Sequence, residues 1–288
     1  IRTDSILAEE GIAVKYRYQL IPGLAGEATG QAISDLAKDD RVSGIYFDRS
    51  ARLCQFGRTE ENGSVENGTA GQDGPTVPDN SSMTQEAFGA DLSLEEYLSP
   101  ARVIGADKLW EKGIDGRGIR VAVIDSGIDK NHPDLVGKVV AEKNFLSDEI
   151  TADDLLGHGT MVAGIIAGSG AASGGKYRGI APGADLISVK VIDGQGDGKV
   201  SDIIAGIEWA VYSGADVLSL SLGGINLGET NPPITMAADN AAAAGVVVCV
   251  AAGNRNSSES QATVAKSVAR MATASLSSRN LIKASTGP

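Results

Sequence analysis

Asp125 is the first residue whose type and position could support chemistry. It ends the apolar run of residues 121–124 and is followed by serine and glycine. In open α/β sheets, ligands and catalytic groups gather at the carboxyl ends of the strands, so this carboxylate is a candidate functional group. A turn or a helix cap would explain a single aspartate after a strand equally well.

His158 lies between Gly157 and Gly159, at the start of an apolar segment. Because glycines carry no side chains, another residue or a substrate can approach this ring closely. The partly positive amino end of a helix disfavours the imidazolium ion. We therefore expect a neutral histidine, which suits a general base. A buried aspartate on its far nitrogen would fix the tautomer. The other histidine, His132, precedes a proline, which is typical of a structural turn.

Two further segments combine an apolar run with a polar or glycine-rich end. Asn254 follows the run of residues 246–252 and a glycine, where a neutral amide donor could hold a developing oxyanion. The alternative interpretation of Asn254 is an ordinary turn residue, which is the commoner role of an isolated asparagine. Ser221, Leu222 and Gly223 end another apolar run, where bare backbone could pair with an extended peptide. An ordinary strand exit explains that segment as well.

Strands and helices alternate around these residues. Four apolar runs predict buried parallel strands, at residues 119–124, 186–192, 217–222 and 246–252. Helices are predicted near residues 158–168, 200–213 and 233–244. This order predicts an α/β fold, with a mostly parallel sheet and helices on both faces.

The chain divides into three predicted segments. Residues 1–52 predict a small α+β unit, with a strand at 12–20, a helix at 25–38 and a second strand at 42–47. Residues 53–92 are rich in turn formers and acidic residues, which predicts a flexible linker. Residues 93–288 hold the α/β pattern.

Three short motifs occur together in one chain: Asp-Ser-Gly-Ile-Asp at 125–129, Gly-His-Gly-Thr at 157–160 and Ala-Ala-Gly-Asn at 251–254. Their order and flanking residues resemble the subtilisin-like serine proteases, the subtilases, over about residues 93–288. The resemblance implies a subtilisin-like fold and a serine endopeptidase acting on polypeptides. It implies that Asp125 orients His158, that His158 takes a proton from a serine, and that Asn254 holds the oxyanion.

The same resemblance implies a peptide cleft. Ser221, Leu222 and Gly223 would form one wall together with Ala252, and residues Gly196, Asp197 and Gly198 would form the facing edge. Asp197 would favour basic or polar side chains in the substrate.

Residues 1–52 resemble the later part of the family's inhibitory propeptides, which implies a zymogen inhibited by its own amino-terminal segment. Cleavage is expected between Phe47 and Asp91. The resemblance also implies a secreted monomer that requires no cofactor. The loop of residues 168–175 has no side-chain oxygens beyond its serines, which argues against the structural calcium ion of some relatives. Asp134 is the one position to watch for it.

The sequence departs from the family at the nucleophile. Family members carry a Gly-Thr-Ser-Met-Ala motif well after the asparagine, and these 288 residues contain none. The expected explanation is a chain that stops before the motif, so we expect this chain to be inactive alone. The alternative is a pseudoprotease that binds peptides without cleaving them.

Composition and two other motifs limit the remaining function classes. A net charge of −12 argues against nucleic acid as a partner, because phosphate binding needs clustered lysine and arginine. No apolar run is long enough for a membrane helix. Cys249 is predicted to be a buried free thiol. The glycines at 194–198 lack the spacing of a nucleotide-binding loop, and an EF-hand there would have Ile204 in place of the bidentate glutamate.

Overall fold

The computed structural model describes residues 11–53, 100–223 and 232–251, in two compact units. One unit comprises Ile1–Cys54 and Asp115–Pro288, and the other is Gln55–Ile114. The described part of the second unit holds two short helices, α3 (Pro100–Val103) and α4 (Ala106–Trp110). Gly105 joins them with a left-handed φ of 74°, a conformation that costs glycine little.

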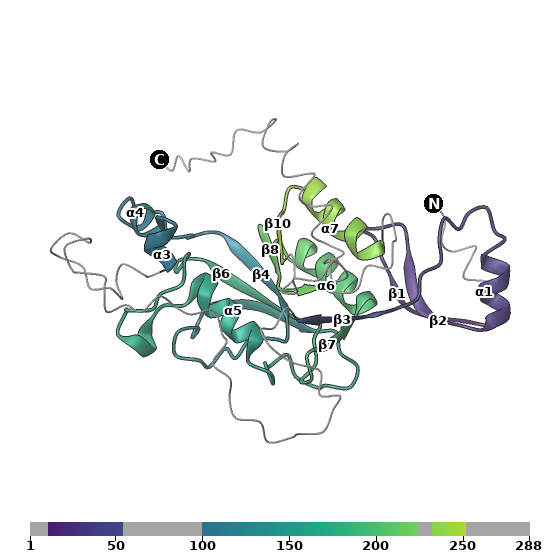
Figure 1. Ribbon diagram of the computed structural model, residues 1–288, viewed down its shortest axis with the longest axis horizontal. Helices are drawn as coiled ribbons and strands as arrows, with labels where there is room; N and C mark the ends of the chain where they lie inside the picture. The colour runs from purple at the N-terminus through teal and green to yellow at the C-terminus, as the bar shows by residue number, and fades with distance from the viewer. Residues whose placement is uncertain (1–10, 54–99, 224–231, 252–288) are drawn as a thin grey trace, which may run out of the picture. The chain divides into compact units, whose positions relative to one another are not determined.

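A five-stranded sheet forms the centre of the first unit (Figure 1). Its order is β10 (Val247–Val250), β8 (Val217–Leu220), β4 (Arg120–Asp125), β6 (Asp185–Lys190) and β5 (Val139–Asn144). All four neighbouring pairs are parallel. The predicted parallel α/β sheet is therefore confirmed.

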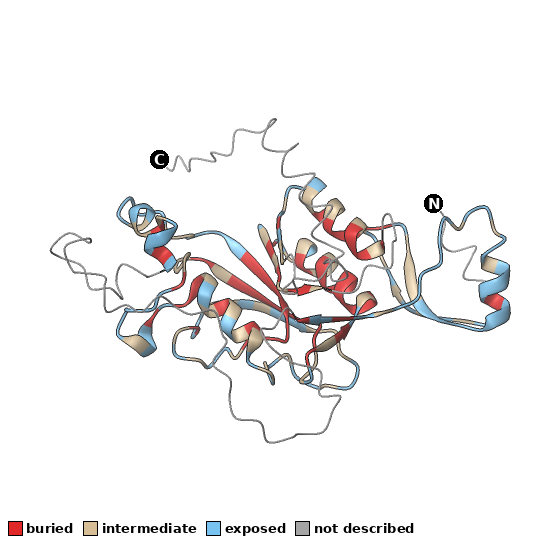
Figure 2. Ribbon diagram, viewed as in Figure 1, coloured by how far each residue is buried: buried red, intermediate tan, exposed pale blue. Residues whose placement is uncertain are grey.

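Helices cover both faces of this sheet, because successive side chains of a strand point to opposite faces. On β4, Val121 and Val123 join a core cluster with α5 (His158–Ala167). Ala122 and Ile124 join the cluster that contains α6 (Val200–Tyr212) and α7 (Pro233–Ala243). Figure 2 shows the buried residues along the strands and on the helices.

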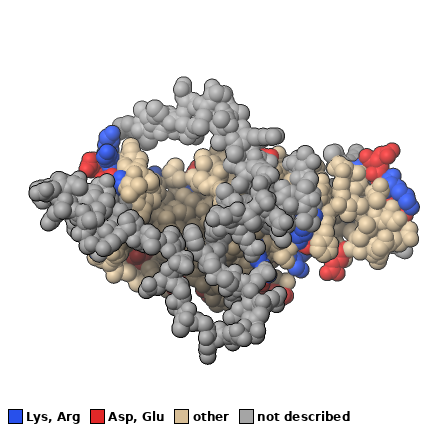
Figure 3. Space-filling view, in the orientation of Figure 1, with Lys and Arg blue, Asp and Glu red and all other residues tan. Residues whose placement is uncertain are grey.

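The amino-terminal segment begins with an antiparallel hairpin, β1 (Ile12–Arg17) and β2 (Leu24–Ala28). Helix α1 (Gly30–Leu36) follows, with the Thr29 side chain accepting a hydrogen bond from the Ala32 amide. The predicted helix at 25–38 is therefore wrong over its first residues. A Cβ on Gly26 would lie 2.1 Å from the Ala13 carbonyl oxygen. Close backbone pairing with β1 therefore makes this segment a strand rather than the start of a helix. Figure 3 shows lysine, arginine, aspartate and glutamate together at the end that holds α1.

The second predicted strand, residues 42–47, is also wrong. This segment is irregular, and the Phe47 residue is 84% exposed. The strand forms instead at β3 (Ser50–Leu53), which lies between β7 (Asp197–Lys199) and β9 (Leu222–Gly223) in an antiparallel three-stranded sheet. Partner strands on both sides, rather than the apolar pattern, determine where the strand forms.

Other features differ from the sequence prediction or lie beyond it. Cys249 is free but exposed rather than buried, because it lies on β10 at the edge of the sheet. Strand β5 and the 3₁₀-helix η4 (Ala171–Ser173) were not predicted. Among the residues described, no helix has the length and apolar character needed to cross a membrane. The division at 52/53 and 92/93 stays a prediction.

Candidate active site

Asp125 is the last residue of β4 and lies in the interior of the protein. The residue is 1% exposed, and its Oδ1 accepts a hydrogen bond from the Ser126 amide at 2.8 Å. The backbone amides of Val191 and Ile192 donate to the Asp125 carbonyl oxygen, at 2.9 and 3.2 Å. Hydrogen bonds from two chain segments therefore fix this strand end, and the carboxylate lies away from water.

His158 begins α5, and its ring lies against that carboxylate. Nδ1 is 2.8 Å from Asp125 Oδ1 and 3.0 Å from Oδ2. A carboxylate can only accept a hydrogen bond, so Nδ1 carries the proton in this contact. In the neutral ring, Nε2 is then the unprotonated nitrogen and can accept a proton from another group.

Glycines allow the two elements to approach this closely. A Cβ on Gly159 would lie 2.1 Å from the Gly127 carbonyl oxygen and 3.3 Å from the Asp125 Cβ. Gly127 has a φ of 102°, and a Cβ there would lie 2.4 Å from the Ala152 carbonyl oxygen. Side chains at either position would force the start of α5 away from the end of β4.

The electrostatics of the pair differ from the sequence-based expectation. The hydrogen bond to Asp125 raises the pKa of His158; burial of the ring opposes this, and the negative charges of Asp125 and Asp154 add to it. The net direction is upward, opposite to the effect expected from the helix amino end. The carboxylate at hydrogen-bonding distance is the largest cause of this upward shift.

The predicted cleft residues flank strand β3. Arg52 pairs with Asp197 on one side and with Gly223 on the other, and Leu53 pairs with Leu222. The Leu53 amide donates to the Gly196 carbonyl oxygen at 3.3 Å. These two segments therefore bind an extended strand through their backbones, as a peptide groove does.

Side chains of β3 alternate between the hydrophobic core and solvent. Ala51 is 1% exposed and Leu53 is 9% exposed, and both join the core cluster that includes Leu222. Arg52 points outward, with its Nε 2.5 Å from Asp197 Oδ1. Both side chains of this pair are partly exposed, so it fixes register more than it stabilises the fold.

The Gly196 segment, which hydrogen-bonds to β3, lies next to the loop that precedes His158. A Cβ on Gly196 would contact Leu156 Cδ2 at 3.8 Å, two residues before the histidine. Gly198 pairs with Ala51, and Ser221 lies between β8 and β9. Asn254 and Ala252 lie outside the described residues, but the Ala251 amide donates to the Leu220 carbonyl oxygen at 3.0 Å.

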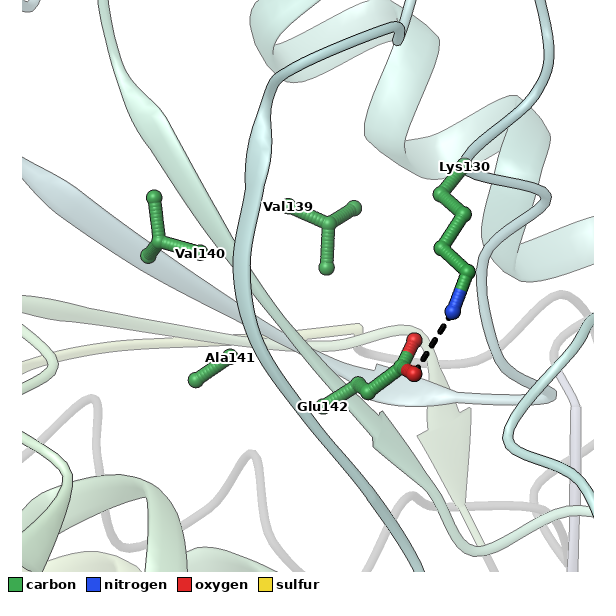
Figure 4. Close-up of a pocket in the computed structure, with 5 residues that line it drawn as sticks. All are labelled: Lys130, Val139, Val140, Ala141 and Glu142. Atoms are coloured by element: carbon green, nitrogen blue, oxygen red, sulfur yellow. Dashed lines mark hydrogen bonds and ion pairs between the residues drawn. The ribbon is translucent and has the colours of Figure 1, made fainter.

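A surface pocket lies elsewhere, on β5 (Figure 4). Its lining includes Lys130 and Glu142, which form an ion pair at 2.6 Å, and none of the predicted site residues. Asp134 Oδ1 accepts a hydrogen bond from the Ala172 amide at 2.7 Å, so this carboxylate serves the 3₁₀-helix η4. The prediction on calcium stays untested.

Sequence reasoning missed three residues around the pair: Ser126, Asp154 and Lys190. Ser126 is buried, and Asp154 accepts hydrogen bonds from the segment that begins α5. Lys190 is fully buried at the end of β6, opposite Asp125 in the sheet register. A lysine inside an apolar run was visible in the sequence and could have marked a polar site.

Comparison with known proteins gives a consistent result. A model of the subtilase family matches residues 116–286. Subtilisin E of Bacillus subtilis (strain 168) is 42% identical over 264 residues, which cover 91% of this chain and 57% of subtilisin E. Serine protease AprX of the same organism is 44% identical over 151 residues, 49% of this chain and 34% of AprX. The major intracellular serine protease of that organism is 41% identical over 168 residues, 57% of this chain and 51% of that protein. The chain thus spans from a third to little more than half the length of these relatives.

Replacing Asp125 with asparagine should lower the pKa of His158, because the carboxylate that stabilises the imidazolium is lost. Since the folded-state pKa is raised, the pair stabilises the fold fully below the ordinary value of 6.5. That stabilisation disappears as the pH rises through the folded-state pKa. NMR titration of the two histidines measures the change. Asp148→Asn, at an exposed loop position, is the matched control, and an unchanged His158 titration in Asp125→Asn would contradict the assignment.

Proposed function

The chain belongs to the subtilase family, and on that basis we propose that it supplies the aspartate–histidine part of a serine endopeptidase. The observation that supports this most is the buried contact between His158 Nδ1 and Asp125 Oδ1, at 2.8 Å. The contact leaves Nε2 available as the general base, which is the arrangement that activates a hydroxyl nucleophile.

The proposed reaction uses this pair twice. His158 Nε2 takes the serine hydroxyl proton while the serine oxygen attacks the peptide carbonyl carbon. The imidazolium that forms is stabilised by Asp125, in the same direction as the raised pKa of the ring. That proton then passes to the leaving amine, and a water repeats the sequence on the acyl-enzyme. Asn254 is proposed as a donor to the oxyanion.

We propose that the nucleophile is a serine outside these 288 residues. The sequence contains no Gly-Thr-Ser-Met-Ala motif. The match covers 57% of subtilisin E. A large part of that relative therefore has no counterpart in these residues. We therefore expect these 288 residues alone to lack hydrolytic activity, and we propose that hydrolysis requires a product that also carries the serine.

A fluorophosphonate probe, which labels activated serines, tests this proposal. We expect labelling of the product that extends through the nucleophile motif and none of the 288-residue chain. His158→Ala in the longer product should reduce the labelling rate about 10⁴-fold or more, as loss of a triad member does in subtilisin, a relative. His132→Ala is the matched control and should label normally.

The same labelling experiment distinguishes the protease from the alternative, a pseudoprotease that binds peptides without cleaving them. Strand β3 pairs with β7 and β9. This pairing supports the alternative, because binding a strand through its backbone requires no nucleophile. Alanine at the nucleophile position of the gene, or no labelling of the folded longer product, would support the binding protein and contradict the protease.

We also propose that the amino-terminal segment inhibits the site as the family's propeptides do. Strand β3 occupies the groove between Asp197 and Gly223, where a substrate strand would pair. A peptide substrate and β3 need the same backbone groups, so they must compete. Removal or cleavage of the segment would then open the groove, and cleavage is proposed between Phe47 and Asp91.

Contacts on α6 hold this segment in place. Glu208 Oε2 accepts hydrogen bonds from the backbone amides of Gln19 and Leu20, at 2.5 and 2.6 Å. The Asp202 carboxylate, on a 4% exposed side chain, pairs with Lys15 at 2.6 Å and accepts from the Tyr16 hydroxyl at 2.8 Å. Acidic groups on one helix thus bind the hairpin that precedes β3.

Removing the Glu208 carboxylate should loosen the segment. Hydrogen bonds to a charged group contribute about 1.5–3 kcal/mol each, so Glu208→Ala should reduce amide protection in β3 about tenfold or more. Hydrogen exchange of the Ser50–Leu53 peptide measures this. Glu142→Ala, which removes an exposed ion pair on β5, is the control. Equal protection of β3 in both variants would contradict the proposed docking.

Localisation and assembly stay predictions from the family resemblance. We propose a secreted monomer that needs no cofactor and acts on polypeptides, and a preference for basic or polar substrate side chains opposite Asp197. Secretion in particular rests on the resemblance alone, since one of the relatives is named as an intracellular protease.

A further inference from the structure

Asp154 lies four residues before His158, and its carboxylate accepts an unusual number of hydrogen bonds. Oδ1 accepts from the Ser126 hydroxyl at 2.9 Å and from the amides of Leu156 and Gly157, at 3.0 and 2.8 Å. Oδ2 accepts from the Thr160 amide at 2.8 Å and from the Thr160 hydroxyl at 2.6 Å. One side chain therefore joins the end of β4, the loop before α5 and the first turn of α5.

Ser126 turns these contacts into a closed network around the His158–Asp125 pair. Its amide donates to Asp125 Oδ1 at 2.8 Å, and its hydroxyl accepts from the Gly159 amide at 3.0 Å while donating to Asp154. The residue is 1% exposed, so water cannot easily replace these partners. An ordinary helix cap would bond to its own helix only, whereas this network also holds the strand that carries Asp125.

The charge of Asp154 suits this position. Burial alone would raise the pKa of the carboxyl, but hydrogen bonds from Thr160, Gly157 and Ser126 outweigh it and hold the pKa below its ordinary value. The group is therefore ionised at neutral pH, and a negative charge at the amino end of α5 is favourable.

Lys190 anchors the loop from the opposite side. This fully buried lysine ends β6, next to Asp125 in the sheet. Its Nζ donates to the Asp153 carbonyl oxygen at 2.5 Å and pairs with Glu149 Oε2 at 2.7 Å. These contacts attach the loop that contains Glu149 and Asp153, and hence Asp154, to the central sheet.

We propose that Asp154 is a positioning residue, whose carboxylate holds the His158 ring against Asp125 through Ser126 and the first turn of α5. Asp154 makes no contact with the His158–Asp125 hydrogen bond. Its negative charge raises the pKa of the ring, and its hydrogen bonds to Ser126 and Thr160 restrict where α5 begins relative to β4. The geometric part can be tested on this chain alone, whereas its consequence for turnover rests on the proposed function.

Two variants and a matched control test the positioning role by NMR of the full 288-residue chain with labelled histidine. Asp154→Asn turns Oδ2 into an amide that cannot accept from Thr160, and Ser126→Ala removes the bridge without changing charge. Asp153→Asn removes the same charge one residue away, at an exposed carboxylate. The readouts are the tautomer of His158 and its titration, with the His132 signal and circular dichroism reporting on folding.

We expect both network variants to give a mixed His158 tautomer and a pKa closer to its ordinary value, while Asp153→Asn changes neither. A parent-like tautomer and titration in folded Ser126→Ala would overturn the proposal. So would equal shifts in Asp154→Asn and Asp153→Asn, which would indicate charge alone. If Asp154→Asn fails to fold, Ser126→Ala decides the question, because it loses a single hydroxyl.

In the longer, serine-containing product, the same variants should lower kcat about 10- to 100-fold with little change in KM, since misplacing a catalytic group costs rate rather than binding. A raised KM with unchanged kcat would contradict positioning. If that product shows no hydrolysis while the NMR result holds, the proposed function fails and the positioning role stands.

Discussion

Burial of the Asp125 carboxylate constrains the structure around it. Removing a carboxylate from water costs several kcal/mol unless hydrogen-bond donors replace the lost solvent. The donors here are the Ser126 amide at 2.8 Å and His158 Nδ1 at 2.8 Å. The end of β4 and the start of α5 must therefore meet at van der Waals distance, and the glycines at 127 and 159 make that approach sterically possible. The need to keep β4 and α5 together gives Ser126 and Asp154 their place, since their hydrogen bonds join the end of β4 to the first turn of α5.

The strand end that carries Asp125 also connects the pair to the groove. Val191 and Ile192 donate to the Asp125 carbonyl oxygen, and the chain then continues to the glycines at 196 and 198 that border β3. A substrate strand in that groove would lie along the same loop that supports the carboxylate. The proposed base and the proposed binding edge therefore have a common support, which is how parallel sheets assemble sites from separate loops.

Parts of this arrangement could be predicted from the sequence because they depend on local pattern. Uninterrupted apolar runs predicted four strands of the central sheet, and the glycines around His158 predicted a close approach to its ring. Strand β5 was missed because Glu142 and Lys143 give it a polar, edge-strand character. Strand β3 could not be predicted, since Ser-Ala-Arg-Leu becomes a strand only between two partners that come much later in the chain. The role of Asp154 also depends on Ser126, 28 residues away, so spacing alone could not indicate it.

The tautomer of His158 tests the central claim most directly. Long-range proton–nitrogen NMR at a pH above the titration of the ring distinguishes a protonated Nδ1 from a protonated Nε2. The buried contact with Asp125 predicts that Nδ1 carries the proton and that Nε2 is the unprotonated nitrogen. A ring protonated at Nε2, or one that exchanges freely between both tautomers, would contradict the arrangement on which the proposed base depends.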